Sequence, residues 1–488
     1  MSRRVVIIGG GFAGAFTAKY LHRYAGDDCE VELINAENYF VFQPLLPEVA
    51  SGTISAPDAV TPLRYMLPHT RVRMAEVTHL EPARCTVHLL QGSKRVPQQV
   101  DYDHLVIAVG QKTNLSCSTG FEEHSLCIRN LADAHELRNR VIRCLEHADI
   151  TDDQALKKRL LTFVVAGGGF SGVETIGEMA EMIRRTLKFY PNVSADDIDA
   201  IIVQRGDRIL PELPEKLGRY AAAKLERRGV RVICDDSIAS ASADAVFLAS
   251  GERIETNTLV TTVGNGPHPF TAGLGIELQR GKIPVDRQLR VGGLDNVWSL
   301  GDAALIPLDE QGSSFAPPTA QFAVREARCV ARNIAAAISG STCSAFSYAP
   351  KGSLASIGNY KAVAELFGLR LSGLLAWILW RGVYIGMLPG FSTRLRVALN
   401  WLFDYFLPRS IVQIANRGPT ATDYRRYVKG DVISEPGQNI DGFYTVLSGC
   451  LESRIPDRAG GQDFVRILGP GDHWGERTLN RRSITVGT

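Results

Sequence analysis

The chain has 488 residues, of which 45% are hydrophobic and 22% charged, and its formal net charge is +2. This length suits two to four globular domains, and the near-neutral charge gives no electrostatic reason to expect a nucleic acid as partner. The nine cysteines contain no CxxC pair, so we expect reduced thiols, with neither a disulfide framework nor a metal site.

The first expected element is a buried strand over residues 5–8 that runs directly into glycines. This short apolar run predicts no signal peptide. The stretch RVVIIGGGFAG places Gly9, Gly11 and Gly14 in the spacing GxGxxG, ahead of a helical segment. Glycine permits the tight turn, the close approach of backbone to a pyrophosphate, and the packing of helix on strand. A single motif of this kind also fits a purely structural turn.

A second copy of the pattern follows in TFVVAGGGFSG, with Gly167, Gly169 and Gly172 ahead of VETIGEMAEMIRR. In both copies the helix N-terminus would offer free N–H groups and a positive dipole end to phosphates. Two copies, each between a strand and a helix, predict two Rossmann-type dinucleotide-binding domains. Such a pair is typical of a flavoprotein with FAD on the first fold and NAD(P)H on the second.

The positions where an acidic residue would bind each adenosine ribose are amides here. They are Asn35 after the first motif and Gln204, followed by Arg205, after the second. Asparagine can bond a ribose hydroxyl without charge assistance. Gln204 lacks the charge that repels a 2′-phosphate, and Arg205 could pair with one. We therefore expect NADH and hypothesise that NADPH is also accepted, the alternative being that Arg205 is a solvated loop residue.

The stretch NVWSLGD (296–302) predicts a strand that ends at Gly301 and Asp302. An acidic side chain at a strand end can accept hydrogen bonds from the ribityl hydroxyls of FAD. The alternative is an N-cap or turn aspartate.

The sequence PPTAQFAVREA (317–327) predicts a helix that Thr319 caps and whose entry suits the two prolines. Gln321 and Arg325 are one turn apart and project from the same face. An arginine on this face can donate hydrogen bonds and stabilise negative charge that develops on a neighbouring group.

Five stretches resemble the type II NADH dehydrogenases, single-subunit NADH:quinone oxidoreductases that pump no protons. The most particular is NYFVFQPLLPEVASGTI (38–54); the others are GGGFAG, AGGGFSGVETIGEM, WSLGDAA and PPTAQFAVREA. The resemblance as a whole extends from residue 4 to about residue 410. The resemblance implies an FAD-dependent enzyme that passes electrons from NADH to a membrane quinone.

The resemblance also implies roles for individual residues. Glu174 would lie by the nicotinamide and flavin, orienting the donor and relaying protons, unless it only stabilises the helix dipole. Gln43 and Lys361 would lie beside the flavin ring. Gln321 and Arg325 would lie at the quinone mouth, although many relatives carry a second glutamine where Arg325 stands. The alternative for Arg325 is a pair with an acidic neighbour.

Residues 370–409 contain three of the five tryptophans and a single aspartate, together with five arginines: Arg370, Arg381, Arg394, Arg396 and Arg409. The apolar run 371–380 is too short to span a bilayer. Arginines beside a tryptophan-rich apolar face predict amphipathic helices that lie in the headgroup plane. We expect a peripheral protein on the cytoplasmic face of the cell membrane, the alternative being a core-packing hairpin or a homodimer interface.

The last segment alternates apolar and polar residues between glycine turns, as short antiparallel strands do. It resembles part of the cyclic-nucleotide-binding β-roll. By that resemblance Glu476 would take the ribose hydroxyl and Arg482 with Ser483 the cyclic phosphate. The spacing from Glu476 to Arg482 is shorter than usual, and a structural or interaction β-roll is the alternative.

Together these patterns predict an α/β fold with two Rossmann-type domains, amphipathic membrane-binding helices and a partial β-roll. The expected boundaries are 1–112 and 267–345 for the FAD domain, 113–266 for the NAD(P)H domain, 346–416 for the membrane segment and 420–488 for the β-roll. Two other functions stay open: a soluble NAD(P)H-dependent reductase of a small electron-carrier protein, and a flavin or nucleotide sensor with the β-roll as output. The first helix lacks cysteine, which argues against a thiol relay.

Overall fold

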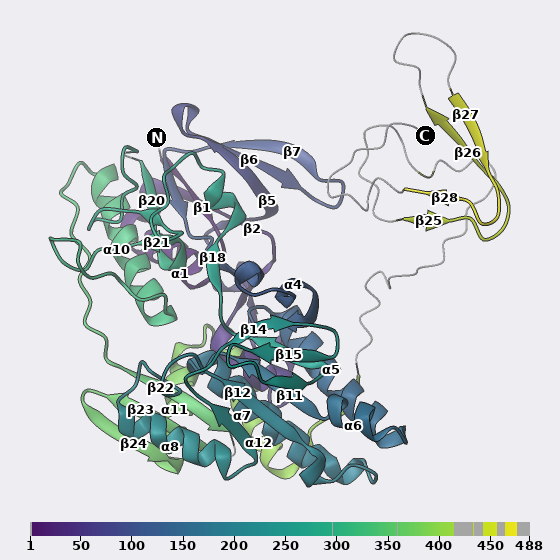
Figure 1. Ribbon diagram of the computed structural model, residues 1–488. Coiled ribbons are helices and arrows are strands. Elements are labelled where there is room, and N and C mark those ends of the chain that lie inside the picture. Colours follow the sequence, from purple (N-terminus) through teal and green to yellow (C-terminus); the bar gives the residue numbers. More distant parts are fainter. Residues whose placement is uncertain are drawn as a thin grey trace. The chain divides into compact units, whose positions relative to one another are not determined.

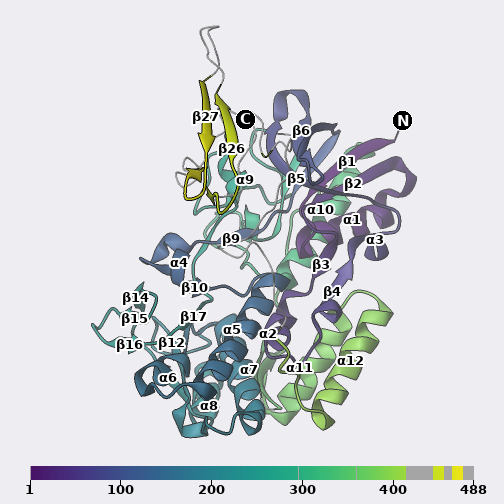
Figure 2. The same cartoon turned by 90° about the vertical axis from the view of Figure 1, so that its right-hand side faces the viewer.

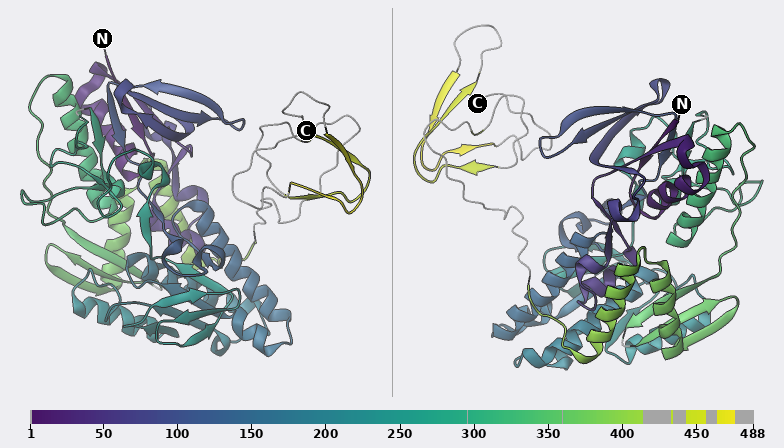
Figure 3. Two further views of the ribbon diagram at one scale, coloured as in Figure 1. Left: turned by 45° about the horizontal axis from the view of Figure 1, so that its top comes forward. Right: turned by 180° about the vertical axis from the view of Figure 1, so that it is seen from behind.

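The computed structural model describes residues 2–294, 296–358, 360–413, 433, 443–455 and 464–475. The chain divides into two compact units, Met1–Ile414 and Ala415–Thr488, seen in Figures 1 and 3. In its described part the smaller unit contains two antiparallel pairs, β25 (Tyr444–Thr445) with β28 (His473–Trp474) and β26 (Leu451–Ile455) with β27 (Phe464–Leu468). These are the short strands that the alternating pattern predicts.

A seven-stranded sheet in the order β20–β8–β1–β2–β5–β6–β7 forms the first half of the larger unit. The strands are β1 (Arg3–Ile8), β2 (Cys29–Asn35), β5 (Arg71–Glu81), β6 (Thr86–Gln91), β7 (Val96–Asp101), β8 (His104–Ile107) and β20 (Val297–Ser299). The pairs from β20 to β5 are parallel and the last two are antiparallel. Residues 5–8 are buried, as in a strand covered on both faces. Helices α1 (Phe12–Ala25) and α10 (Ala320–Ile338) pack against each other (Figure 1).

A second, all-parallel sheet has the order β10–β17–β11–β12–β13. Its strands are β10 (Ser125–Leu126), β11 (Thr162–Ala166), β12 (Asp199–Val203), β13 (Val230–Ile233) and β17 (Thr258–Thr261). Five helices accompany it: α4 (Phe121–His124), α5 (Leu131–Ile150), α6 (Gln154–Leu160), α7 (Phe170–Thr186) and α8 (Glu215–Glu226). A three-stranded antiparallel sheet adds β14 (Ile238–Ala241), β15 (Ala245–Leu248) and β16 (Arg253–Glu255). The parallel part of the first sheet and the all-parallel second sheet confirm the two Rossmann-type folds.

Short helices and strands connect these sheets. They are β3 (Tyr39–Val41), α2 (Leu46–Ala50), β4 (Val60–Pro62), α3 (Leu63–Met66), β9 (Gln111–Thr113), β18 (Asn265–Pro267), α9 (Pro269–Ala272), β19 (Ile283–Pro284) and β21 (Ala304–Leu305). Strands β9 and β18 pair antiparallel where the chain enters and leaves the second sheet. The return of the chain brings β20 beside β8, and this places the residues after β20 near the first glycine turn.

The C-terminal part of the larger unit starts with an antiparallel sheet that the sequence analysis did not identify. It consists of β22 (Gly352–Gly358), β23 (Lys361–Leu366) and β24 (Leu369–Gly373), and β22 packs on α7. Helices α11 (Leu374–Met387) and α12 (Phe391–Phe406) follow and lie side by side (Figure 2). No helix within the described ranges has the length and apolar character needed to cross a bilayer.

The expectation of a tryptophan-rich outer face on α11 and α12 is wrong. Trp380 and Trp401 are buried, and the guanidinium of Arg381 lies 3.8 Å from the Trp377 ring centre and 4.4 Å from that of Trp401. Arg409 is buried as well. The indole N–H groups turn inward because buried glutamates accept their hydrogen bonds. The outer face instead carries leucine and phenylalanine, with Leu375 69% and Phe391 80% exposed.

Candidate active site

The first glycine turn has the shape of a pyrophosphate cradle. Gly9 has φ +104°, and a Cβ there would lie 2.4 Å from the Ala108 carbonyl oxygen. A Cβ on Gly14 would lie 1.9 Å from the Gly9 oxygen, whereas the space beside Gly11 holds no protein atom within 4 Å. Helix α1 starts at this open space without a side-chain cap, so its first N–H groups are available to an anion. These residues fit the pyrophosphate of FAD.

The second glycine turn repeats this construction at the start of α7. Gly167 has φ +105°, and a Cβ on Gly172 would lie 1.8 Å from the Gly167 oxygen. The N-cap Gly169 leaves α7 without a side-chain cap. One body therefore contains two uncapped helix N-termini behind glycine turns, as two dinucleotide sites require.

Asn35 and Gln204 hold the two glycine turns in the same way. The Asn35 Oδ1 accepts from the Gly10 N–H at 2.8 Å, and the Gln204 Oε1 accepts from the Gly168 N–H at 2.8 Å. The Asn35 Nδ2 donates to the Glu37 carbonyl. No described residue accepts from the Gln204 Nε2, so its N–H groups remain available as donors. Arg205 is exposed and has no ion pair with any residue in the described ranges.

The GDA turn after β20 meets α1 and α10. A Cβ on Gly301 would lie 2.9 Å from the Ala13 Cβ, and Gly301 has φ +69°. Its N–H donates to the Glu326 Oε2 at 2.8 Å. Burial raises the pKa of Asp302, and burial together with the Asp302 charge raises the pKa of Glu326 to about 7. Sequence reasoning missed Glu326, whose signal was a carboxyl on the buried face of an amphipathic helix.

The face of α10 with Gln321 and Arg325 contacts the segment before β22. Thr319 caps the helix through the Phe322 N–H, as predicted. The Gln321 Nε2 donates to the Gly352 carbonyl at 3.2 Å, and its Oε1 accepts from the Tyr348 hydroxyl. The Arg325 guanidinium lies 5.2 Å from the centre of the Tyr348 ring, and no acidic residue of the described chain pairs with it. Tyr348, which sequence reasoning missed, therefore connects the two predicted residues.

The structure does not bring every predicted residue together. The exposed Gln43 donates from Nε2 to the Arg129 carbonyl at 3.2 Å. Lys361 begins β23, and no bond joins it to another predicted site residue within the described part. Glu476, Arg482 and Ser483 lie outside the described residues.

Glu174, the fifth residue of α7 and therefore in its second turn, is buried. Its Oε1 accepts from the Ser356 N–H at 2.9 Å and from the Trp380 Nε1 at 3.2 Å. Burial raises the pKa of Glu174 to about 8, because it outweighs both hydrogen bonds, which lower it. At neutral pH this carboxyl therefore holds a proton.

Glu178 and Glu181 continue the buried face of α7 at the helical spacing. Glu181 pairs with three arginines, Arg184 at 2.7 Å, Arg185 at 2.7 Å and Arg228 at 3.1 Å. Their hydrogen bonds and charges overcome burial and hold the pKa of Glu181 at about 2. Glu181 therefore stays ionised at neutral pH.

This charge network also anchors the C-terminal hairpin of α11 and α12. The Arg185 guanidinium lies 3.2 Å from Asp404 near the end of α12. Arg409 lies 2.9 Å from Asp404 and 3.4 Å from Glu178. Breaking a buried pair of this kind costs about 3–5 kcal/mol, so the network fixes the hairpin against α7.

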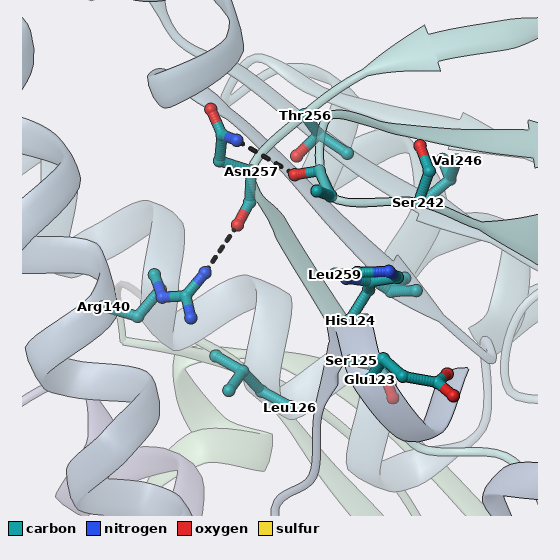
Figure 4. A pocket seen from close by; sticks show the side chains of 11 residues that line it. Glu123, His124, Ser125, Leu126, Arg140, Ser242, Val246, Thr256, Asn257 and Leu259 are labelled. Atoms are coloured by element: carbon teal, nitrogen blue, oxygen red, sulfur yellow. Dashed lines mark hydrogen bonds between the residues drawn. The ribbon is translucent and has the colours of Figure 1, made fainter. Parts of the chain in front are cut away.

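A separate cavity of about 240 Å³ lies among α4, α5, β15 and β17. Arg140 lines it and donates to the Asn257 carbonyl at 2.8 Å (Figure 4). None of the residues predicted for the site lines this cavity. It is therefore distinct from the candidate active site.

Substitution of Gly11 tests the first cradle. A methyl at Gly11 meets no protein atom within 4 Å, so Gly11→Ala should change the free energy of unfolding of the flavin-free protein by less than about 0.5 kcal/mol. The same methyl enters the space of a bound phosphate. The Kd for FAD, measured by flavin fluorescence, should rise at least tenfold, or roughly 1.4 kcal/mol. Gly292→Ala, which also meets no protein atom, is the control; wild-type affinity in Gly11→Ala would contradict the assignment.

Three family models match successive parts of the chain. Residues 3–327 match the family model of pyridine nucleotide-disulphide oxidoreductases, residues 351–410 match the NDH2 C-terminal domain, and residues 424–486 match the cyclic nucleotide-binding domain. The last match lies mostly outside the described residues.

Relatives match across most of the chain. A type II NADH:quinone oxidoreductase of Mycobacterium tuberculosis is 32% identical over 423 residues, which cover 83% of this chain and 89% of that protein. An internal alternative NAD(P)H-ubiquinone oxidoreductase of Arabidopsis thaliana is 28% identical and covers 84% of this chain and 86% of its own. The solved structure of NDH2 from Plasmodium falciparum has a TM-score of 0.78 at 21% identity over 84% of this chain and 100% of that chain, which confirms the fold. By its motifs, its two glycine turns and its coverage, the chain belongs to the family of type II NADH:quinone oxidoreductases.

Proposed function

We propose that the protein oxidises NADH and reduces a membrane quinone through FAD, without pumping protons. The overall reaction is NADH + H⁺ + quinone → NAD⁺ + quinol. Bound FAD supplies the two-electron chemistry that connects the two substrates. The observation that carries the proposal is the pair of uncapped glycine turns in one body, in a chain that matches an NADH:quinone oxidoreductase over 83% of its length.

Each half of the site has its own residues in this proposal. The turns at Gly9 and Gly167 bind the two pyrophosphates, and Asp302 accepts from the ribityl hydroxyls of FAD. Glu174, protonated and buried, orients the donor and holds a proton. Gln321 and Arg325 face the quinone, where Arg325 stabilises the negative charge that develops on the quinone oxygen.

Substitutions on α10 should separate the two half-reactions. Arg325→Ala and Gln321→Ala should each lower kcat/KM for a short-chain quinone at least tenfold, because a charge-assisted contact contributes roughly 1.5–3 kcal/mol. Bleaching of the flavin by NADH in stopped flow should change less than twofold. Arg332→Ala is the matched control, because Arg332 lies on the same helix as Arg325. Its guanidinium also lies over a tyrosine ring, 5.1 Å from the centre of Tyr24 on α1. Equal losses in both half-reactions would remove the quinone role of this face.

We also propose that NADPH is accepted beside NADH. Gln204 offers a donor amide where a carboxylate would repel a 2′-phosphate, and the exposed Arg205 follows it. The Gln204 amide and the Arg205 guanidinium are both hydrogen-bond donors, and they favour a phosphate because its oxygens accept hydrogen bonds.

A carboxylate at position 204 should abolish this tolerance. Gln204→Glu can still accept from the Gly168 N–H, so the turn is preserved while charge repulsion appears. We expect the ratio of kcat/KM for NADPH to that for NADH to fall tenfold to a hundredfold, in steady-state assays with both nucleotides. A wild-type efficiency with NADPH below about a thousandth of that with NADH corresponds to ~4 kcal/mol of discrimination and would reject the proposal.

We infer that α11 and α12 attach the protein peripherally to the cytoplasmic face of the membrane. Their exposed apolar side chains are Leu374, Leu375, Ile378, Phe391, Leu395, Leu399, Leu402, Phe403 and Phe406. Arg394 and Arg396 stand on α12 among them. An apolar face with basic residues beside it suits an anionic lipid surface, and a quinone dissolved in the bilayer would then be within reach.

Substitutions that introduce negative charge on the apolar face of α11 and α12 should weaken binding of the protein to lipid. Leu375→Glu with Phe403→Glu should reduce binding to vesicles that contain anionic lipid at least tenfold in a sedimentation assay. Flavin bleaching by NADH should stay within twofold. Phe189→Glu, at a side chain 44% exposed outside α11 and α12, is the control. Unchanged vesicle binding with loss of a homodimer would assign the face to self-association instead.

A further inference from the structure

Tyr348 lies in the segment between α10 and β22 and contacts both side chains that we propose for the quinone. Its hydroxyl donates to the Gln321 Oε1. The Arg325 guanidinium lies 5.2 Å from the centre of its ring, and the Phe322 ring meets it edge to face at 5.1 Å. These contacts hold the half-buried Tyr348 ring against the start of α10.

The contact with the Tyr348 ring holds Arg325 without using its hydrogen-bond donors. A guanidinium over an aromatic ring is attracted by the π electrons of that ring. Arg325 has neither an ion pair nor a hydrogen bond with any residue in the described ranges. A guanidinium carries five N–H donors in a planar fork and keeps its charge at all ordinary pH values. These donors and this charge therefore stay available to an acceptor that approaches the helix.

The Gln321 amide, in contrast, is held by hydrogen bonds on both of its polar atoms. Its Oε1 accepts from the Tyr348 hydroxyl and from the Lys351 N–H at 3.2 Å, and its Nε2 donates to the Gly352 carbonyl at 3.2 Å. An amide oxygen has two lone pairs, and an amide nitrogen has two N–H groups. The oxygen is therefore fully used, and one N–H is left. Gln321 can offer a ligand a donor but no acceptor.

This face of α10 thus presents only donors, and Tyr348 is the residue that makes it so. A quinone oxygen accepts hydrogen bonds and gains negative charge as the ring takes up electrons, so it is stabilised by donors and by a cation. An acceptor on the same face would repel it. The Tyr348 hydroxyl keeps the Gln321 oxygen turned toward the segment before β22, and the Tyr348 ring keeps Arg325 in place while leaving it unpaired.

We propose that Tyr348 is a positioning residue of the quinone site: its hydroxyl fixes the Gln321 amide as a donor, and its ring holds Arg325 for the developing negative charge. The inference rests on the function proposed above and deepens it. Tyr348 neither gains nor loses a proton or an electron in this role, so the overall reaction stays as written.

Two substitutions in the full-length, FAD-loaded protein separate the ring from the hydroxyl. Tyr348→Phe keeps the ring beneath Arg325 and leaves the Lys351 N–H to hold the Gln321 oxygen. The limiting rate of flavin reoxidation by a short-chain quinone should fall roughly twofold to fivefold. Tyr348→Leu removes both contacts, and this rate should fall at least roughly tenfold. The half-saturating quinone concentration should change less than the rate, because the guanidinium acts on charge that develops during reduction. Bleaching by NADH should stay within about twofold in both variants.

A double variant tests whether Tyr348 acts through Arg325. In the background of Arg325→Ala, Tyr348→Leu should slow reoxidation no further than Tyr348→Phe does in the wild type, because only the hydroxyl contact is left to lose. Tyr24→Leu is the matched control: it removes a ring 5.1 Å from the guanidinium of Arg332 on the same helix and should leave quinone kinetics unchanged. A further tenfold loss in the double variant, or equal slowing of both half-reactions, would overturn the proposal.

A binding measurement without turnover completes the test. The probes are 2-hydroxy-1,4-naphthoquinone, whose hydroxyl is ionised at neutral pH, and its neutral 2-methoxy analogue, each titrated into the oxidised protein while flavin absorbance is followed. An unpaired guanidinium should make the wild type bind the anion at least roughly fivefold more tightly. Tyr348→Phe should keep this preference, and Tyr348→Leu and Arg325→Ala should lose it. Tyr348→Met takes the place of Tyr348→Leu if the latter does not fold.

The outcomes distinguish the positioning role from the proposed function. A wild type that binds both probes equally, or a Tyr348→Leu protein that keeps the preference for the anion, would overturn the role of Tyr348. A wild type that reduces no quinone would contradict the function on which the inference rests, whatever the probes show.

Discussion

The burial of three glutamates on one face of α7 is the constraint around which the site is arranged. Each buried carboxyl must be neutralised by a cation or by a proton. Glu181 has three arginines, Glu178 has Arg409, and Glu174 has only neutral donors. The number of arginines paired with each glutamate therefore falls from three at Glu181 to none at Glu174. The decrease runs toward the N-terminus of α7, where the second glycine motif lies.

The same helix connects the second glycine turn with the C-terminal hairpin. Its N-terminus lies behind the turn proposed for NADH, and its buried face packs against α2, β22 and the anchor of the α11–α12 hairpin. The apolar outer face of the hairpin and the acids behind it thus belong to one rigid arrangement. In this arrangement bound FAD would supply the electron transfer, and the glutamates of α7 are buried from solvent.

The sequence patterns predicted those features whose interacting residues are close together in the chain. The glycine spacing, the Thr319 cap and the shared face of Gln321 and Arg325 follow from one turn or one helix. The interior contacts could not be predicted, because the Trp401–Glu48 bond joins residues 353 positions apart and the Ser356–Glu174 bond spans 182. For that reason the tryptophans were expected to face lipid, although their N–H groups turn inward. Gln204 was expected at the ribose end of the second fold, where it would not repel a 2′-phosphate; its hydrogen bond to the Gly168 N–H was not predicted.

One measurement tests the central claim most directly. The purified protein, loaded with FAD under anaerobic conditions, is mixed first with one equivalent of NADH and then with a short-chain quinone, while flavin absorbance is followed. The structure and the family predict bleaching by NADH and full return of colour with quinone, one quinol formed for each NADH consumed. A protein that cannot retain FAD, or a bleached flavin that quinone leaves unchanged, would contradict the claim.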